Sequence, residues 1–179
     1  RPLLGNPDLK PEQTTSYELG LDHLINESLR LNATAYFKDI QDLVTVRRLE
    51  GSTALNPIDR FVNEDYGTVK GIDLSLEVLP GNGNFSGSVS YGYMIATGNG
   101  SDATEAYYTW LTSTTDTVQP VTEYPLDFDQ RHTLTAVMSY HAPRDWKARL
   151  FGMRIPGNWG LSLVGYYGSG LPYTQVDNS

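Results

Sequence analysis

The chain has 179 residues, a net charge of −8 and no cysteine. This composition disfavours nucleic-acid binding and excludes a disulfide scaffold or a thiolate metal site. No stretch approaches the roughly 18 consecutive apolar residues of a membrane-spanning helix, whereas the strands of a membrane β-barrel need only about 9–11 alternating residues each. Seventeen glycines, twelve tyrosines and 19% charged residues indicate an extended, turn-rich, all-β chain.

The first third of the chain predicts a polar lead-in and two strands. Residues 1–11 contain NPDLKPE, whose prolines prevent a regular helix or strand throughout. Alternation of apolar and polar residues predicts one strand at 14–24 and, after a tight turn at 25–27, a second that begins at Leu29. The pattern of this second strand decays through residues 39–46 into a polar connection that reaches about Pro57.

The clearest signal is a hairpin between residues 68 and 96. Its first strand belongs to a segment at about 61–78, which could break near Gly67, and its second strand spans about 85–96. PGNGN turns the chain between them. On the first strand every second residue is apolar, and the residues between are mostly polar. Period-two alternation gives a strand with one apolar face and one polar face.

A long polar connection follows at residues 97–130, and a loop of this length is expected in a compact domain only where it is functional. Residues 102–111 could hold a short helix. A fifth strand is predicted at 131–140, and a connection at 142–158 leads to a sixth that begins near Trp159. The sequence therefore predicts six strands, or seven if Tyr173 begins another.

Connection lengths distinguish the two ends of this predicted antiparallel up-and-down meander. The turns near Ile25 and Pro80 share one end and are short, whereas the connections 39–57 and 97–130 share the other end and are long. Short turns at one rim and long loops at the other are typical of an outer-membrane barrel. The 142–158 connection is longer than this arrangement predicts. A sheet with one face on a soluble core also alternates.

Five short motifs follow one another along the chain: NPDLKPE with YELG (6–20), AYFKDI with DL (35–43), the segment Asn63–Asp73, Asp129-Arg131-His132, and SGLPYT (169–174). This ordered set resembles the β-barrel of TonB-dependent outer-membrane receptors and covers nearly the whole chain. Asp73 stands where that family often has glutamate.

The resemblance implies a barrel of about 22 strands with a plugged lumen, which imports a scarce nutrient across the Gram-negative outer membrane with energy from an inner-membrane complex. We expect residues 1–179 to be an internal fragment of such a barrel, without the plug domain. Its partners would be its own plug, the remaining strands, the TonB complex, outer-membrane lipid and an unknown small ligand. Neither enzymatic activity nor a cofactor is implied. Six strands leave two bare edges, so the isolated fragment should not be a stable soluble monomer.

The resemblance also assigns an environment to each face. Charge on a lipid-facing barrel position costs roughly 2–4 kcal/mol at the membrane midplane, whereas the lumen tolerates charge. The lipid-facing candidates are Ile72, Leu74, Leu76, Val78, Leu134, Ala136, Met138, Leu161 and Leu163. The candidates that face the lumen or the plug are Arg30, Lys38, Asp73 and Glu77.

Candidate ligand contacts lie in the long connection. Its aromatic residues could stack on a sugar or hold an apolar ligand, or they could pack the loop or line the membrane rim; they are Tyr107, Tyr108, Trp110 and Tyr124. No catalytic motif such as G-x-S-x-G is present. We expect no metal site, since the polar residues Asp127, Asp129 and His132 are ordinary for a loop that enters a strand.

Two alternative functions fit the pattern of alternation. One is a soluble or secreted β-sandwich that binds a ligand through the 97–130 loop. The other is a passive porin or adhesion barrel without energy coupling.

Overall fold

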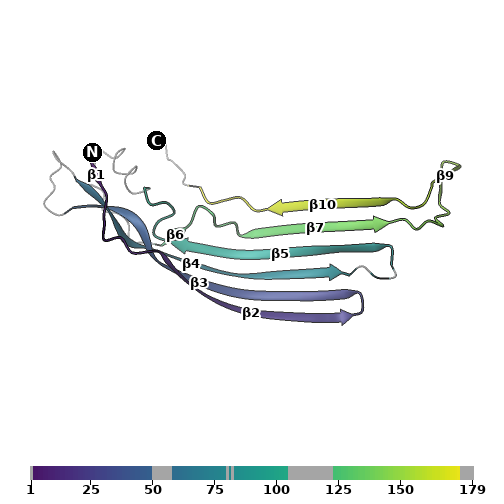
Figure 1. Ribbon diagram of the computed structural model, residues 1–179, viewed down its shortest axis with the longest axis horizontal. Helices are drawn as coiled ribbons and strands as arrows, with labels where there is room; N and C mark the ends of the chain where they lie inside the picture. The colour runs from purple at the N-terminus through teal and green to yellow at the C-terminus, as the bar shows by residue number, and fades with distance from the viewer. Residues whose placement is uncertain (1, 50–57, 80, 82, 105–122, 174–179) are drawn as a thin grey trace, which may run out of the picture.

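Period-two alternation produces long antiparallel strands in the computed structural model, which describes residues 2–49, 58–79, 81, 83–104 and 123–173. Within these residues, six long strands form an up-and-down sheet in the order β10-β7-β5-β4-β3-β2 (Figure 1). They are β2 (Gln13–Asn26), β3 (Leu29–Arg48), β4 (Asp59–Val78), β5 (Phe85–Gly98), β7 (His132–His141) and β10 (Gly160–Gly168). The prediction of an all-β antiparallel meander is confirmed.

Four short strands accompany the long ones. β1 (Leu3–Leu4) pairs in parallel with β4, and β6 (Tyr124–Pro125) pairs with β5. Between β7 and β10, β8 (Arg149–Leu150) and β9 (Met153–Arg154) form a separate two-stranded sheet. None of the described residues forms a helix that is long and apolar enough to cross a membrane.

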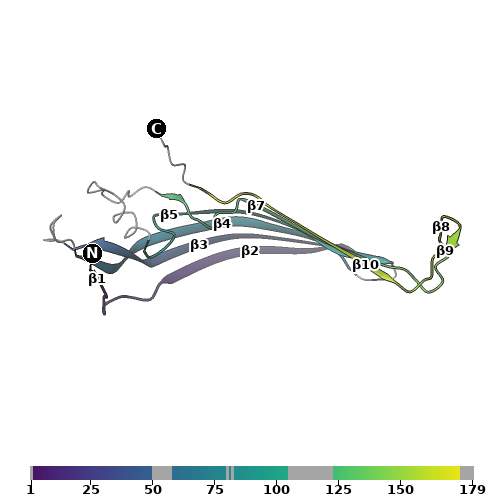
Figure 2. The same cartoon turned by 90° about the horizontal axis from the view of Figure 1, so that it is seen from above.

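The sheet is a single curved layer that does not close on itself (Figure 2). Strands β2 and β10 each have a long neighbour on one side alone, so both edges of the described sheet are open. A β-sandwich requires two sheets packed face to face about 10 Å apart. Because the described residues provide no second layer on either face, the fold is that of a partial barrel rather than a sandwich.

Strands β3 and β4 extend further toward the long-loop end than the sequence pattern predicts. The predicted connection 39–57 is wrong, because β3 continues to Arg48 and residues 49–58 alone separate the two strands. The register shifts between Ile40 and Val44, where Asp42 has a φ of 59°. Such a bulge reverses which side chains face which side, so the alternation fails although the strand continues. β4 also runs unbroken through Gly67.

The short-turn end differs from expectation in one connection. A two-residue turn at Glu27 and Ser28 joins β2 to β3. The connection is short, as predicted, but it lies beyond the predicted residues 25–27 because β2 continues to Asn26. Residues 142–159, in contrast, contain the β8–β9 hairpin, which projects beyond the end of the sheet in Figures 1 and 2. At the other end, residues 102–104 form a bend and a turn, and the remainder of the suggested helix at 102–111 lies outside the described residues.

The buried core is small and lies at the long-loop end, on the face that carries Asp73. Its central cluster consists of Val69, Ala96 and Leu126, and Tyr36, Ile40 and Met94 pack against it. Outside this cluster, Val46 and Ala142 are the other buried hydrophobic residues within the described part of the chain. Most other apolar side chains of the sheet remain uncovered: Leu74, for example, is 42% exposed although it lies in a central strand. A sheet with this much exposed apolar surface needs an apolar partner phase or further protein.

Candidate lipid face, polar face and ligand cavity

The strand register aligns the apolar residues into continuous rows on one face, which we call the apolar face. One row crosses all six long strands, through Leu21, Ala33, Leu74, Tyr91, Leu134 and Tyr167. The next row toward the short turns comprises His23, Leu31, Leu76, Val89, Ala136 and Gly165. All nine lipid-facing candidates share this face, because the register pairs β4 with β5, β5 with β7 and β7 with β10 in phase.

Lys70 is a charged residue on the apolar face that the sequence pattern did not single out. It is in register with Phe37 on β3 and Ile95 on β5, and the next row toward the long loops contains the polar residues Asp39, Thr68 and Thr97. A lysine at the rim of an apolar band can extend its amine toward the polar boundary while its stem covers apolar surface. The part of the apolar face that carries no charge therefore begins at the next row toward the short turns, which contains Ile72.

Aromatic clusters mark both rims of the apolar face. Near the long loops, the Tyr91 hydroxyl lies 2.8 Å from His132 Nδ1, and the Tyr93 and His132 rings lie 5.2 Å apart. Near the short turns, the rings of Tyr140, Trp146 and Trp159 lie 5.7–6.0 Å from one another. Tyr93 is eight residues from Phe85, the partner of Tyr140, which corresponds to ~27 Å along the strand. Strands of outer-membrane barrels are tilted by about 35–45°, so this distance spans roughly 20 Å of membrane height, slightly less than the apolar band of about 25 Å that such barrels carry between two girdles.

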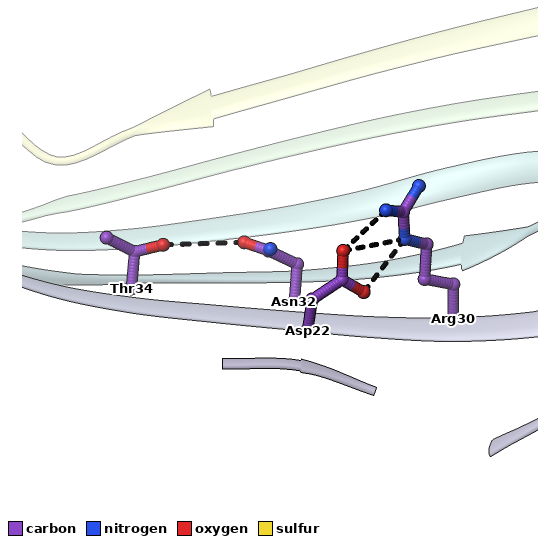
Figure 3. A network of polar contacts seen from close by, with 4 residues as sticks. All are labelled: Asp22, Arg30, Asn32 and Thr34. Carbon is purple, nitrogen blue, oxygen red and sulfur yellow. Dashed lines mark hydrogen bonds and ion pairs between the residues drawn. The ribbon is translucent and has the colours of Figure 1, made fainter. Parts of the chain in front are cut away.

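The opposite face is polar, and Figure 3 shows part of it on β2 and β3. The Arg30 guanidinium binds the Asp22 carboxylate, with Nε 2.9 Å from Oδ1, and both side chains are 47% exposed. Because water surrounds both side chains and screens their attraction, the pair contributes little to stability. Arg30 is also in register with Glu77, and these two residues border a hollow of about 280 Å³ together with Asn32 and Ser75.

The four lumen candidates all lie on this polar face but do not form one cluster. Arg30 and Glu77 are neighbours, as described. Asp73 lies two rows away, beyond the row of Asn32 and Ser75, and is in register with Thr34 and Gly92. Lys38 is nearer the long loops, where its Nζ lies 5.5 Å from the centre of the Tyr36 ring. A pairing of these residues with a plug stays a prediction.

A cavity of about 600 Å³ lies where the end of the long connection meets the segment after β10. Its walls combine aromatic, apolar and charged side chains: Tyr124, Pro125, Asp127, Asp129, Arg131, Leu171, Pro172 and Tyr173, with Gly170. Two hydrogen bonds join the walls, from His132 N to Ser169 Oγ (3.1 Å) and from Ser169 N to His132 O (2.8 Å). Two motifs almost forty residues apart in sequence therefore form one site.

The cavity includes one of the four aromatic candidates. Tyr124 lines it, whereas Tyr107, Tyr108 and Trp110 lie outside the described residues. Sequence reasoning missed Leu171 and Tyr173 as site residues, although it had singled out their motif. The signal that could have found them is the aromatic and proline content of that motif, directly after a strand that ends at the long-loop rim.

Asp129 anchors the cavity wall to the sheet. Its side chain is 2% exposed, and its carboxylate accepts hydrogen bonds from Ala96 N (3.0 Å) and from Arg131 Nε (2.7 Å). The carboxylate raises the pKa of Arg131 above its ordinary value, so the pair is ionic. His132 points to the apolar face and binds Tyr91, so it does not converge with Asp127 and Asp129. Within the residues that the structure describes, no group of three or more His, Asp or Glu side chains could hold a metal ion.

A family model described as "TonB dependent receptor-like, beta-barrel" matches residues 2–179. The chain belongs to the TonB-dependent receptor β-barrel family. The comparison with curated proteins gave no match. The family is one of outer-membrane transport receptors rather than enzymes, and the resemblance inferred from the ordered motifs is confirmed.

The structure explains two of the motifs that this TonB-dependent receptor chain carries. Asn63, the first residue of the third motif, holds the NPDLKPE lead-in against the sheet. Its Oδ1 accepts a hydrogen bond from Lys10 N (2.8 Å), and its Nδ2 donates to Lys10 O (3.0 Å) and to Asp42 O (2.7 Å). In the same motif, a Cβ on Gly71 would lie 2.5 Å from the Tyr36 hydroxyl, so glycine leaves room for this ring to cross β4.

Asn63→Ala is expected to release the lead-in while the sheet stays intact, because three hydrogen bonds to Lys10 and Asp42 are lost. Loss of about 1–2 kcal/mol of local stability should speed amide hydrogen exchange at Lys10 roughly tenfold. Exchange measured by mass spectrometry on the full-length receptor checks this. Asn26→Ala, at the opposite end of the sheet, is the matched control and should leave exchange at Lys10 unchanged; equal rates in both variants would contradict the role of Asn63.

Proposed function

We propose that the chain forms a sector of the wall of a TonB-energised receptor in the Gram-negative outer membrane, which imports a scarce nutrient by ligand-gated transport. The observation that carries this proposal is the apolar face, which is continuous over six strands, bounded by two aromatic rims and opposed by a charged face. A membrane barrel needs this arrangement.

This proposal assigns an environment to each face and to each rim of the sheet. Ile72, Leu74, Leu76 and Val78 face lipid, and the polar face lines the lumen, where Arg30, Lys38, Asp73 and Glu77 are available to a plug domain of the same protein. The short turns lie on the periplasmic side, and the long loops face outward. The rest of the barrel and the energy-coupling complex are the remaining partners.

The cavity beside Asp129 forms part of the ligand surface in this proposal. It opens at the long-loop end, where an incoming ligand would arrive. Tyr124, Leu171 and Tyr173 offer apolar and aromatic surface, while Asp127 offers an exposed carboxylate. Mixed aromatic and polar walls suit a small amphiphilic ligand, held by stacking and by a few directed hydrogen bonds.

Fractionation and uptake of the full-length protein test this function. We expect it in the outer-membrane fraction, with heat-modifiable migration on gels, and we expect uptake of its ligand to stop when the energy-coupling complex is deleted. Uptake that persists without the complex would favour a passive porin. A protein that partitions into the soluble fraction without heat-modifiable migration would refute the barrel.

A further inference from the structure

The β8–β9 hairpin stands on the apolar side of the short-turn rim. Its base continues the pairing of β7 with β10, through hydrogen bonds from Ala142 N to Trp159 O (2.8 Å) and from Asn158 N to Ala142 O (3.0 Å). Trp146 and Trp159 pack on Tyr140, which is in register with Leu161 of the apolar face. The root of the hairpin therefore lies against the side that the proposed function assigns to lipid, rather than over the lumen.

Positive charge is concentrated in this segment of an otherwise acidic chain. Residues 143–157 contain four of the 13 basic residues but one of the 21 acidic residues, Asp145. The four cations are Arg144, Lys147, Arg149 and Arg154, and all four side chains are exposed. Within the part of the chain that the structure describes, no ion pair joins them to a carboxylate. Among the described residues, this charge therefore has no carboxylate that neutralises it.

The residues at the tip of the hairpin are an unfavourable combination if water surrounds them. Arg149 lies directly opposite Arg154, and like charges in this position repel each other. Phe151 occupies the turn with a φ of 52°, ahead of Gly152 at 83°, although such turns favour Gly, Asn or Asp. Phe151 is 91% exposed and Met153 is 71% exposed. The facing arginines become favourable if anions lie between them, and the exposed Phe151 becomes favourable if its ring enters an apolar phase.

We propose that the β8–β9 hairpin is a membrane-binding foot that holds anionic phospholipids of the bilayer leaflet at the short-turn rim. Arg144, Lys147, Arg149 and Arg154 bind the phosphate-bearing headgroups, and Phe151 with Met153 enters the acyl-chain boundary beneath them. Cations beside exposed aromatic and aliphatic residues are the composition of an interfacial anchor. This inference rests on the proposed function, because it uses the same assignment of the apolar face to lipid.

Site-directed quenching in the full-length receptor tests the foot. The chain contains no cysteine, so Met153→Cys can carry a fluorophore after any cysteine elsewhere in the receptor is removed. The receptor is placed in phosphatidylcholine nanodiscs that contain an equal share of doxyl-labelled phosphatidylglycerol or doxyl-labelled phosphatidylcholine. The phosphatidylglycerol probe should quench the label preferentially. Arg149→Gln combined with Arg154→Gln should reduce this preference at least fivefold, roughly the factor that one basic residue near an anionic surface contributes.

Two controls make each outcome decisive. Lys10→Gln with Arg47→Gln removes the same charge at the opposite end and should leave the preference unchanged, while heat-modifiable migration verifies that every variant has folded. A second label at Leu74→Cys reports on the apolar face itself. Equal quenching by both probes at residue 153 would refute the binding of anionic lipid by the hairpin but would leave the lipid-facing assignment intact. Quenching at residue 74 alone would have the same consequence and would point to a protein partner for the hairpin. Absence of quenching at both positions overturns the lipid-facing assignment as well.

Discussion

Leu74→Arg is expected to destabilise the full-length receptor in a bilayer by about 2 kcal/mol, because a basic residue on the lipid face costs about 2–4 kcal/mol at the membrane midplane and less toward the rims. Leu74 lies between Ala33 and Tyr91, in the row next to the middle row of the apolar face, which contains Leu76 and Val89. The introduced arginine side chain has no water-filled space to enter if the apolar face contacts lipid. Neighbouring rows provide no carboxylate to pair with the new charge.

Ser75→Arg is the matched control, because it introduces the same side chain one residue further along β4 on the opposite face. Ser75 lies in register with Asn32 and Ser90 and borders the same hollow as Glu77, so an arginine there has water and a carboxylate nearby. We expect a change below about 1 kcal/mol. Urea unfolding of each variant in lipid vesicles measures the difference. Equal destabilisation by the two substitutions would contradict the assignment of the faces.

Asp129→Ala is expected to detach the cavity wall from the sheet. The substitution leaves Ala96 N without its acceptor and Arg131 without its counter-charge. Breaking a buried ion pair costs several kcal/mol, but Arg131 is 40% exposed and water replaces part of the interaction. We therefore expect a loss of about 2–3 kcal/mol, with a parallel loss of ligand uptake because Tyr124 and Asp127 are no longer held opposite Tyr173.

Asp127→Ala separates the two roles of the acidic residues in this wall. The Asp127 carboxylate is exposed, and it is the backbone N of this residue that binds Ser101 Oγ (3.1 Å). Its removal should leave unfolding unchanged within about 0.5 kcal/mol. Urea unfolding and hydrogen exchange at Ala96 report on stability, while uptake reports on the ligand surface. If Asp129→Ala leaves exchange at Ala96 unchanged, the anchoring role is wrong.

Local periodicity was sufficient to predict the faces of the sheet. Residues 72–78 alternate strictly because a half-buried strand presents successive side chains to different phases, so the apolar positions of β4 could be assigned before any pairing was known. The same holds for β7 and β10. The pattern failed near Asp42, since a bulge places two residues where the partner strand has one. A period-two reading interprets that shift as the end of a strand.

The cavity could not be predicted in the same way, because it depends on pairing between distant segments. Nothing near Asp129 indicates that Leu171 and Tyr173 will lie opposite it; that follows from the register of β7 with β10. The position of Lys70 on the apolar face was not predicted, for a related reason. Its row becomes evident once β4 is aligned with Phe37 and Ile95. The β8–β9 hairpin, which is short and basic, has no apolar period to reveal it.

The meander also influences the order in which the sheet can assemble. Strands β2 to β5 are joined by connections no longer than residues 49–58, whereas β5 reaches β7 through residues 99–131, about three times that length. Closing the longer loop costs about 1 kcal/mol more in chain entropy. Local hairpins form within microseconds, so β2–β5 and β7–β10 are favoured as early, separate units. The contact of Asp129 with Ala96 lies where the two units join, so we expect it to form after the hairpins within each unit.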